Sequence, residues 1–120
     1  MVKVLFKRLN QKAKLPSYKT SGSSGMDLMA CVDEPITIKP NESMLIPTGI
    51  AIAIPEDTEV QIRPRSGLAA KSSISVLNTP GTIDSDYRGE LKIILFNHGK
   101  DEFTVNDEDR VAQMVLMPIL

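Results

Sequence analysis

Apolar residues occur along this chain in short runs that alternate with polar ones. Residues 50–54 place three isoleucines in alternation with alanines, and in residues 59–63 Val60 and Ile62 alternate with polar side chains. Residues 91–96 begin as an alternation and then become wholly apolar. A period of two is typical of β-strands, and a wholly apolar run is typical of a strand buried on both faces. The pattern therefore predicts a chain built mainly of short strands.

Proline and glycine divide these runs at short intervals. The chain has 8 prolines and 7 glycines, spread from residue 16 to residue 118, and they leave little room for long helices. We expect a single all-β domain over residues 1–120, folded as a sandwich, barrel or jelly roll. The Ser/Gly-rich residues 20–25 are expected to form a flexible loop.

One segment departs from the strand pattern. Gly67 to Lys71 is rich in good helix formers, and Ser66 is a residue type that favours the N-cap position. We expect a helix of one or two turns that begins after Ser66 and stops before Ser72.

Composition narrows the classes of function. The chain has 120 residues, 42% of them apolar, with a formal net charge of -1, so no broad surface for nucleic acid or membrane is expected. The sequence has no run of about 18 apolar residues, so a membrane span is not expected. The cytoplasm is the expected location. Cys31 is the only cysteine and is expected to be a small buried apolar residue. With His98 as the only histidine, a zinc site is not expected.

The expected helix start is a candidate phosphate site. A helix N-terminus attracts anions, Arg65 adds a permanent cation, Ser66 adds a hydroxyl, and Gly67 permits close backbone approach. The alternative is an ordinary capped helix that carries a surface arginine.

The densest polar run, residues 78–90, lies between two strand-like segments and is expected to form a hairpin with an elaborate tip. Asn78 offers the donor and acceptor that a nucleobase edge requires, and the ring of Tyr87 can pack on a sugar. If the stretch is extended, Asp84 and Asp86 share one face, where a carboxylate can act as a general base or hold a hydrated metal. The alternative is an acidic turn bounded by glycine.

Two further polar residues lie in apolar surroundings. Asp27 stands at the start of an apolar strand and needs a partner, which can be a cation or a hydrated metal. Gln113 lies within an apolar strand, and its simplest interpretation is a residue that faces solvent.

Four segments together resemble the trimeric dUTPase family, in the family's order. They are residues 24–30 (Ser-Gly-Met-Asp-Leu-Met-Ala), 64–69 (Pro-Arg-Ser-Gly-Leu-Ala), 78–90 with Gly-Thr-Ile-Asp-Ser-Asp-Tyr-Arg-Gly at the centre, and 109–113 (Asp-Arg-Val-Ala-Gln). The third segment is the most specific. The resemblance implies a distorted barrel or jelly roll of the dUTPase type.

The resemblance also implies an activity, the cleavage of dUTP to dUMP and pyrophosphate with Mg²⁺. Such an enzyme limits uracil incorporation into DNA and supplies dUMP for dTMP synthesis. By analogy, Asp84 orients or deprotonates the attacking water and contacts the deoxyribose, and Tyr87 stacks under the sugar and excludes a 2′-hydroxyl. Asn78 and the backbone around Thr82 and Ile83 recognise uracil, in a hairpin too tight for a 5-methyl group.

The resemblance also implies which residues bind the phosphates and the metal. Residues 65–67 hold the phosphates, with Gln113 reaching them from another subunit, and Lys92 lies against the substrate through its main chain. Asp27 helps to organise the hydrated Mg²⁺ ion. The family is a homotrimer with its sites between subunits.

The chain departs from the family pattern at two places. The fourth motif usually has glycine where this chain has Glu108, which puts the local loop in question because such a glycine typically serves a turn with positive φ. The family also carries a glycine-rich arm with an arginine and an aromatic residue, which closes over the site, and the sequence ends at Leu120 before it. We expect this arm to follow Leu120 in the full reading frame, and a protein without it to bind substrate but to turn it over slowly.

Two other functions remain open at this stage. A dCTP deaminase shares the fold, but it needs a glutamate proton shuttle and does not carry Asp-Tyr-Arg-Gly in this hairpin. A non-catalytic nucleotide-binding or regulatory β domain is the other alternative, and the presence of Asp84 and Tyr87 argues against it.

Overall fold

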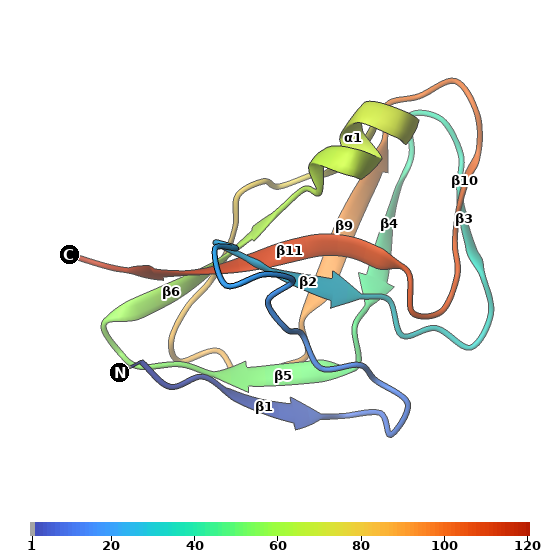
Figure 1. The fold of residues 1–120 in the computed structure, drawn as a ribbon. Helices are drawn as coiled ribbons and strands as arrows, with labels where there is room; N and C mark the ends of the chain where they lie inside the picture. The colour runs from blue at the N-terminus through green and yellow to red at the C-terminus, as the bar shows by residue number, and fades with distance from the viewer. Residues whose placement is uncertain (1) are drawn as a thin grey trace.

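The computed structural model describes residues 2–120 as strands arranged in four sheets, with one short helix (Figure 1). In chain order, the elements are β1 (Leu5–Arg8), β2 (Met26–Met29), β3 (Ile36–Ile38), β4 (Ser43–Pro47), β5 (Ile50–Ala53), β6 (Thr58–Arg63), α1 (Ser66–Ser72), β7 (Ile74–Val76), β8 (Gly81–Ile83), β9 (Lys92–Asn97), β10 (Phe103–Val105) and β11 (Arg110–Pro118).

The largest sheet has the strand order β2-β11-β6-β8, and all its pairs are antiparallel. The long strand β11 lies at its centre and pairs with β2 on one side and β6 on the other (Figure 1). The other sheets are β4-β9-β7 and the two-stranded pairs β1-β5 and β3-β10. Since the sheets pair strands that are distant in sequence, they enclose one core rather than forming separate hairpins.

The core is formed by aliphatic side chains from most of the strands. Strand β6 alternates between buried and half-buried residues, and in β9 Ile93 and Leu95 are buried while Ile94 and Phe96 are half-buried. In β5 the first three residues are all buried, because β5 is packed on both faces. The expected strands at 50–54, 59–63 and 91–96 are therefore confirmed. Cys31 is also buried, as expected, and burial raises the pKa of its thiol because a thiolate is disfavoured there.

The all-β class and the jelly-roll-like architecture are confirmed, and over residues 2–120 the sheets do not close into a barrel. The short helix is also confirmed, with different ends. Arg65, not Ser66, is the N-cap residue, because Arg65 keeps the extended backbone that continues from β6 (φ -86°, ψ 128°). The helix runs one residue further than expected, through Ser72, and ends where Ser73 adopts a left-handed conformation.

The polar run 78–90 connects two strands that do pair, since β7 and β9 are antiparallel neighbours. The connection is more than a hairpin tip, however. It leaves its own sheet, forms β8, and adds this strand to the edge of the large sheet beside β6. Within residues 2–120, no helix is long and apolar enough to cross a lipid bilayer.

Candidate functional site

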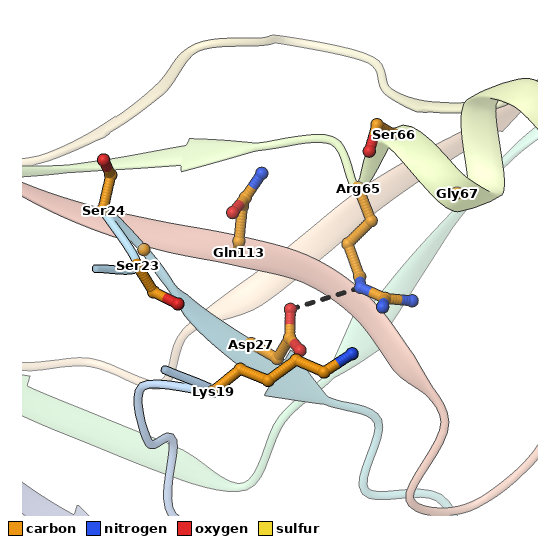
Figure 2. A pocket seen from close by; sticks show the side chains of 9 residues that line it. Lys19, Ser23, Ser24, Asp27, Arg65, Ser66, Gly67 and Gln113 are labelled. Carbon is orange, nitrogen blue, oxygen red and sulfur yellow. Dashed lines mark hydrogen bonds and ion pairs between the residues drawn. The ribbon is translucent and has the colours of Figure 1, made fainter. Parts of the chain in front are cut away.

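A hollow of about 260 Å³ lies on the large sheet, where the start of β2 and the end of β6 flank β11 (Figure 2). We call it the Arg65 pocket. Its lining residues are polar or charged apart from two glycines, and they are Lys19, Ser23, Ser24, Gly25, Asp27, Arg65, Ser66, Gly67 and Gln113. Three of the four segments that carry the family resemblance therefore meet in one hollow of a single chain.

Strand register explains why these residues meet. Gln113 on β11 lies opposite Asp27 on β2 and opposite Arg63 on β6. Directly opposed residues in a sheet point to the same face, and residues two apart on an extended strand also share a face. Since the backbone stays extended through Arg65, its side chain lies on the face of Asp27 and Gln113.

Asp27 is paired with two arginines. Its Oδ1 accepts a hydrogen bond from Nε of Arg65 at 3.2 Å, and its Oδ2 lies 3.8 Å from Nε of Arg110 (Figure 2 shows the first). The side chains of Asp27 and Arg65 are only about a fifth and a quarter exposed. Of the two partners that the sequence left open for Asp27, the structure supplies the cation, and this pairing fixes the direction of the Arg65 guanidinium.

Gln113 faces the Arg65 pocket and is half-buried. Its Nε2 donates to the carbonyl oxygen of Pro64 at 3.2 Å. A Cβ on Gly25 would lie 3.0 Å from Oε1 of Gln113 and 3.1 Å from a main-chain oxygen of β11, so the glycine lets β2 approach closely. The interpretation of Gln113 as a solvent-facing strand residue is therefore wrong. Gln113 was expected to help hold the phosphates from another subunit, but it lies in the same hollow as residues 65–67 of its own chain, because β11 and β6 are neighbours.

The start of α1 forms one wall of the pocket. Ser66 and Gly67 are exposed there, and the N-cap residue makes no side-chain hydrogen bond to the first turn. The side-chain cap that the alternative of an ordinary capped helix requires is therefore absent from α1.

The third resemblance segment forms a different surface. The main-chain N–H of Tyr87 donates to the carbonyl oxygen of Asp84 at 3.1 Å, which closes a tight turn over residues 84–87. The stretch is therefore not extended, and the condition under which Asp84 and Asp86 would share one face of a strand is not met. Both carboxylates line a hollow of about 550 Å³, together with Glu59 on β6 and Arg88. We call it the Asp84 hollow.

Tyr87 and Asn78 are each packed against a glycine. The Tyr87 hydroxyl donates to the carbonyl oxygen of Glu90 at 2.8 Å, and a Cβ on Gly89 would lie only 2.5 Å from that hydroxyl oxygen. The Asn78 amide lies against Gly81, the first residue of β8, where a Cβ would be 3.2 Å from its nitrogen. Asn78 is thus next to the strand that contains Thr82 and Ile83, the residues expected to recognise a base with it.

Lys92 is exposed at the start of β9, opposite Pro47 of β4. It lines neither the Arg65 pocket nor the Asp84 hollow.

Asp84 and Arg65 lie at opposite ends of β6, whereas Asn78 packs against Gly81, which pairs with Ile62 near the C-terminal end of β6. Ile83 pairs with Val60, so Asp84 is level with the beginning of β6, whereas Arg65 follows its end. At roughly 3.3 Å per residue, the six positions from Glu59 to Arg65 span about 20 Å. No single side chain bridges such a distance.

The chain offers few metal ligands of its own. Over residues 2–120, no group of three or more His, Cys, Asp or Glu side chains is placed to hold a metal ion. A magnesium ion bound with a nucleotide commonly takes one or two carboxylates, water and substrate phosphates. A single carboxylate, Asp27, in the Arg65 pocket fits an ion that takes most of its ligands from water and substrate. It does not fit an ion held by protein ligands alone.

The family model for dUTPase matches residues 11–120. The chain belongs to the dUTPase family. Among curated family members, the deoxyuridine 5'-triphosphate nucleotidohydrolase of Rickettsia bellii is 64% identical over 103 residues, which cover 86% of this chain and 69% of that protein. The protein of the same name from Hydrogenobaculum is 55% identical over 119 residues, which cover 99% of this chain and 82% of that protein.

Solved dUTPases share the fold. The dUTPase from phage phi11 of S. aureus superimposes with a TM-score of 0.90 over 98% of this chain and 91% of that chain, at 23% identity. A mutant of the phi11 dUTPase, with a TM-score of 0.89 and 23% identity over 98% of this chain and 92% of its own, is described with a structural Mg(II) ion. At these identities the dUTPase neighbours establish the fold alone.

Two residues near Asp27 were not predicted as parts of a site. Lys19 lines the Arg65 pocket, and Arg110 pairs with Asp27. Residues 20–25, expected to be flexible, form a turn in which Thr20 and Ser23 are joined by hydrogen bonds. The one available signal was the position of Lys19 immediately before the Ser/Gly-rich residues 20–25.

Proposed function

We propose that this chain is a dUTP diphosphatase, which hydrolyses dUTP to dUMP and pyrophosphate. The observation that carries this proposal is the match to the dUTPase family over residues 11–120, with relatives that are more than 50% identical and are named for this reaction. The residue types that the reaction needs are present, with the proposed phosphate ligands in the Arg65 pocket and Asp84 in the Asp84 hollow. Such an activity limits uracil incorporation into DNA and supplies dUMP for dTMP synthesis.

Asp84 is the proposed catalytic residue. In the proposed step, the oxygen of a water molecule bonds to the α-phosphorus, and the bond from that phosphorus to the α–β bridging oxygen breaks. The electron pair of the broken bond leaves with pyrophosphate, and a proton of the water passes to the Asp84 carboxylate. An exposed aspartate in a tight turn is suited to this role because its carboxylate is hydrated and free of an ion pair in the described chain.

Arg65, Ser66, Gly67 and Gln113 are the proposed phosphate ligands. The Arg65 guanidinium and the Gln113 amide share a face, and Asp27 holds the guanidinium in place. Fixed donors of this kind stabilise the charge that develops on the phosphate oxygens. Asp27 is also the proposed contact, through water, to a Mg²⁺ ion, which would offset phosphate charge when bound.

The uracil and the sugar are proposed to bind along residues 78–87, the segment that contains β8. Asn78 offers one donor and one acceptor next to the β8 backbone at Thr82 and Ile83, which matches the edge of uracil. Tyr87 is 44% exposed while its hydroxyl is tied to the main chain, so its ring is a fixed platform for deoxyribose. Lys92 is proposed to touch the substrate through its main chain only.

The complete site is proposed to form between copies of the chain in a homotrimer. The support is the separation of about 20 Å between Asp84 and Arg65 along β6. A second copy that presents its Asp84 hollow to the Arg65 pocket supplies both halves. We also propose a cytoplasmic location, which suits a chain with a single cysteine.

The test is hydrolysis of dUTP by the full-length protein and by Asp84→Asn, followed as pyrophosphate and dUMP. The asparagine has the same shape but cannot accept the proton, so we expect turnover to fall at least about a hundredfold while dUMP still binds. Control reactions contain dCTP and UTP.

Three outcomes would contradict the proposal. Ammonia release from dCTP would make the protein a deaminase. No turnover of dUTP together with nucleotide binding would make it a binding module. Equal, measurable rates for the wild type and Asp84→Asn would remove Asp84 from the reaction.

A further inference from the structure

Lys19 brings a third positive charge to the surroundings of Asp27. It lines the Arg65 pocket and also a smaller hollow of about 110 Å³, which shares Asp27 with that pocket and includes Arg110. Figure 2 shows the Lys19 side chain running past Asp27 on the side of the pocket opposite Ser66 and Gly67. Lys19 is outside the four segments on which the family resemblance rests.

The backbone on both sides of Lys19 is held in place. Tyr18, just before it, forms an antiparallel bridge with Met26 at the start of β2. Thr20, just after it, is tied to Ser23 by three hydrogen bonds of 3.0 to 3.1 Å, two of which use side-chain oxygens. Since both neighbours are fixed, the side chain leaves a defined point at the rim of the Arg65 pocket.

Positive charge exceeds negative charge around the Lys19 side chain. Asp27 is the only acidic residue that lines either hollow, and it is already shared by Arg65 at 3.2 Å and Arg110 at 3.8 Å. Lys19 makes no ion pair with any residue of the described chain, 2–120. Three cations face one carboxylate, in a protein whose net charge is -1. An anionic ligand is the chemistry that balances this excess.

The lining of the Arg65 pocket indicates which part of a nucleotide would fit. It contains cations, hydroxyls, an amide and glycines, but no aromatic ring or base-sized apolar surface. The residues suited to a base and a sugar, Asn78 and Tyr87, lie elsewhere. The Arg65 pocket is therefore suited to the phosphate chain, beyond the α-phosphate on which Asp84 acts.

We propose that Lys19 binds the β- and γ-phosphates of the substrate, the part that leaves as pyrophosphate. Lys19 is thus a substrate-binding residue that favours a triphosphate over shorter phosphate chains. This inference rests on the proposed hydrolysis of dUTP.

The test compares wild type, Lys19→Ala and Lys19→Arg in the full-length protein, with Lys39→Ala as a matched control. Lys39 is an exposed lysine that lines neither hollow, so its loss changes the net charge equally. The measurements are kcat and KM for dUTP, and inhibition constants for inorganic pyrophosphate and for dUMP. We expect Lys19→Ala to raise KM and the pyrophosphate constant about fivefold to tenfold, the size of one exposed charge-assisted hydrogen bond. The dUMP constant should stay unchanged, and Lys19→Arg should restore both values.

An unchanged pyrophosphate constant in Lys19→Ala would overturn the inference. So would an equal weakening of pyrophosphate and dUMP, which would indicate a structural disturbance of the loop, and so would an equal effect of Lys39→Ala. Calorimetric titration with pyrophosphate needs no turnover. It therefore decides the role of Lys19 even if the wild type fails to hydrolyse dUTP, a result that would overturn the proposed function instead.

Discussion

Gly49 is required for two independent reasons. Its φ of +71° lies in the left-handed region, where a side chain costs about 1 to 2 kcal/mol. A Cβ at this position would also lie 2.9 Å from Cβ of Ala13 and 3.0 Å from Sγ of Cys31, both of which are buried. In the turn between β4 and β5, the backbone conformation and the packing of the core therefore both require glycine at this one position.

We predict that Gly49→Ala lowers the free energy of unfolding by about 3 kcal/mol, from the left-handed penalty together with overpacking of the core. Gly22→Ala is the matched control, because no atom lies within 4 Å of the Cβ it would add. The measurement is urea unfolding of both variants and the wild type. A Gly49→Ala protein as stable as Gly22→Ala would show that the turn tolerates a side chain.

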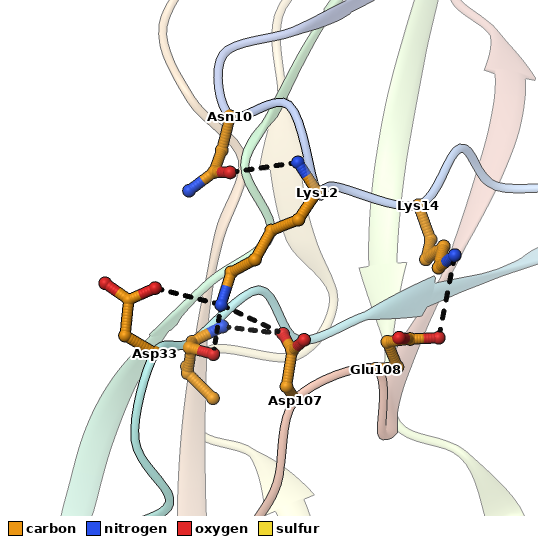
Figure 3. A network of polar contacts seen from close by, with 7 residues as sticks. Asn10, Lys12, Lys14, Asp33, Asp107 and Glu108 are labelled. Carbon is orange, nitrogen blue, oxygen red and sulfur yellow. Dashed lines mark hydrogen bonds and ion pairs between the residues drawn. The ribbon is translucent and has the colours of Figure 1, made fainter.

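Glu108 occupies the position where the family usually has glycine. It adopts φ +68°, the conformation that such a glycine would favour, and its N–H donates to the carbonyl oxygen of Ala30 at 2.9 Å. The turn therefore keeps the glycine-type conformation with a glutamate in it. The Glu108 carboxylate lies 3.7 Å from Nζ of Lys14, which links this turn to the N-terminal segment (Figure 3).

At the scale of elements, the segment between β1 and β2 is fastened by Lys12. Its Nζ donates to the carbonyl oxygen of Val32 at 2.6 Å and lies 2.9 Å from Asp33 and 3.8 Å from Asp107 (Figure 3). Asp107 in turn accepts from the N–H of Val32 at 3.0 Å. Three parts of the chain that are far apart in sequence are joined at this lysine.

The hydrogen bond from Lys12 to Asp33 raises the pKa of the lysine above its usual value of 10.5. A cation with a raised folded-state pKa contributes stability that is fully present below the unfolded value and is lost as pH rises through the folded value. We predict that Lys12→Met melts at a lower temperature than wild type at pH 8, and that this difference shrinks above about pH 10.5. Lys39→Met is the control in the same melting experiments. A difference that is independent of pH would show that Lys12 acts through packing of its aliphatic stem.

The strands and the helix could be predicted because their signals are local. The alternation at 59–63 specifies β6, and the helix formers of 67–71 specify α1, whatever the rest of the chain does. Strand β8 could not be predicted, because its pairing with β6 depends on a partner about 20 residues earlier in the chain.

The candidate site, too, could be predicted only in part. The residue types at 27, 65, 84 and 113 carried enough chemistry to be selected from the sequence. Their grouping was not predictable, because it depends on the register of β2, β11 and β6. Lys19 was overlooked for a related reason: the fixed turn of Thr20 and Ser23 resembles a flexible linker in composition.

At the scale of the whole molecule, the central claim is that a dUTP-hydrolysing site is assembled from two copies of the chain. Arg65 and Asp84 lie at opposite ends of β6, roughly 20 Å apart. Each copy would then contribute its Arg65 pocket to one site and its Asp84 hollow to a second site. Under this proposal, a closed cyclic assembly would satisfy every copy, because each Arg65 pocket would receive the Asp84 hollow of a neighbour.

Subunit mixing tests this claim most directly. Arg65→Ala and Asp84→Asn are each expected to be inactive alone, and the two are unfolded together, refolded at equal amounts and assayed for pyrophosphate release from dUTP. If sites lie between copies, a random mixture pairs an intact Arg65 pocket with an intact Asp84 in about one quarter of sites, which restores about one quarter of wild-type activity. If each site belongs to one chain, every site keeps one defect, and a mixture as inactive as its parents would contradict the account.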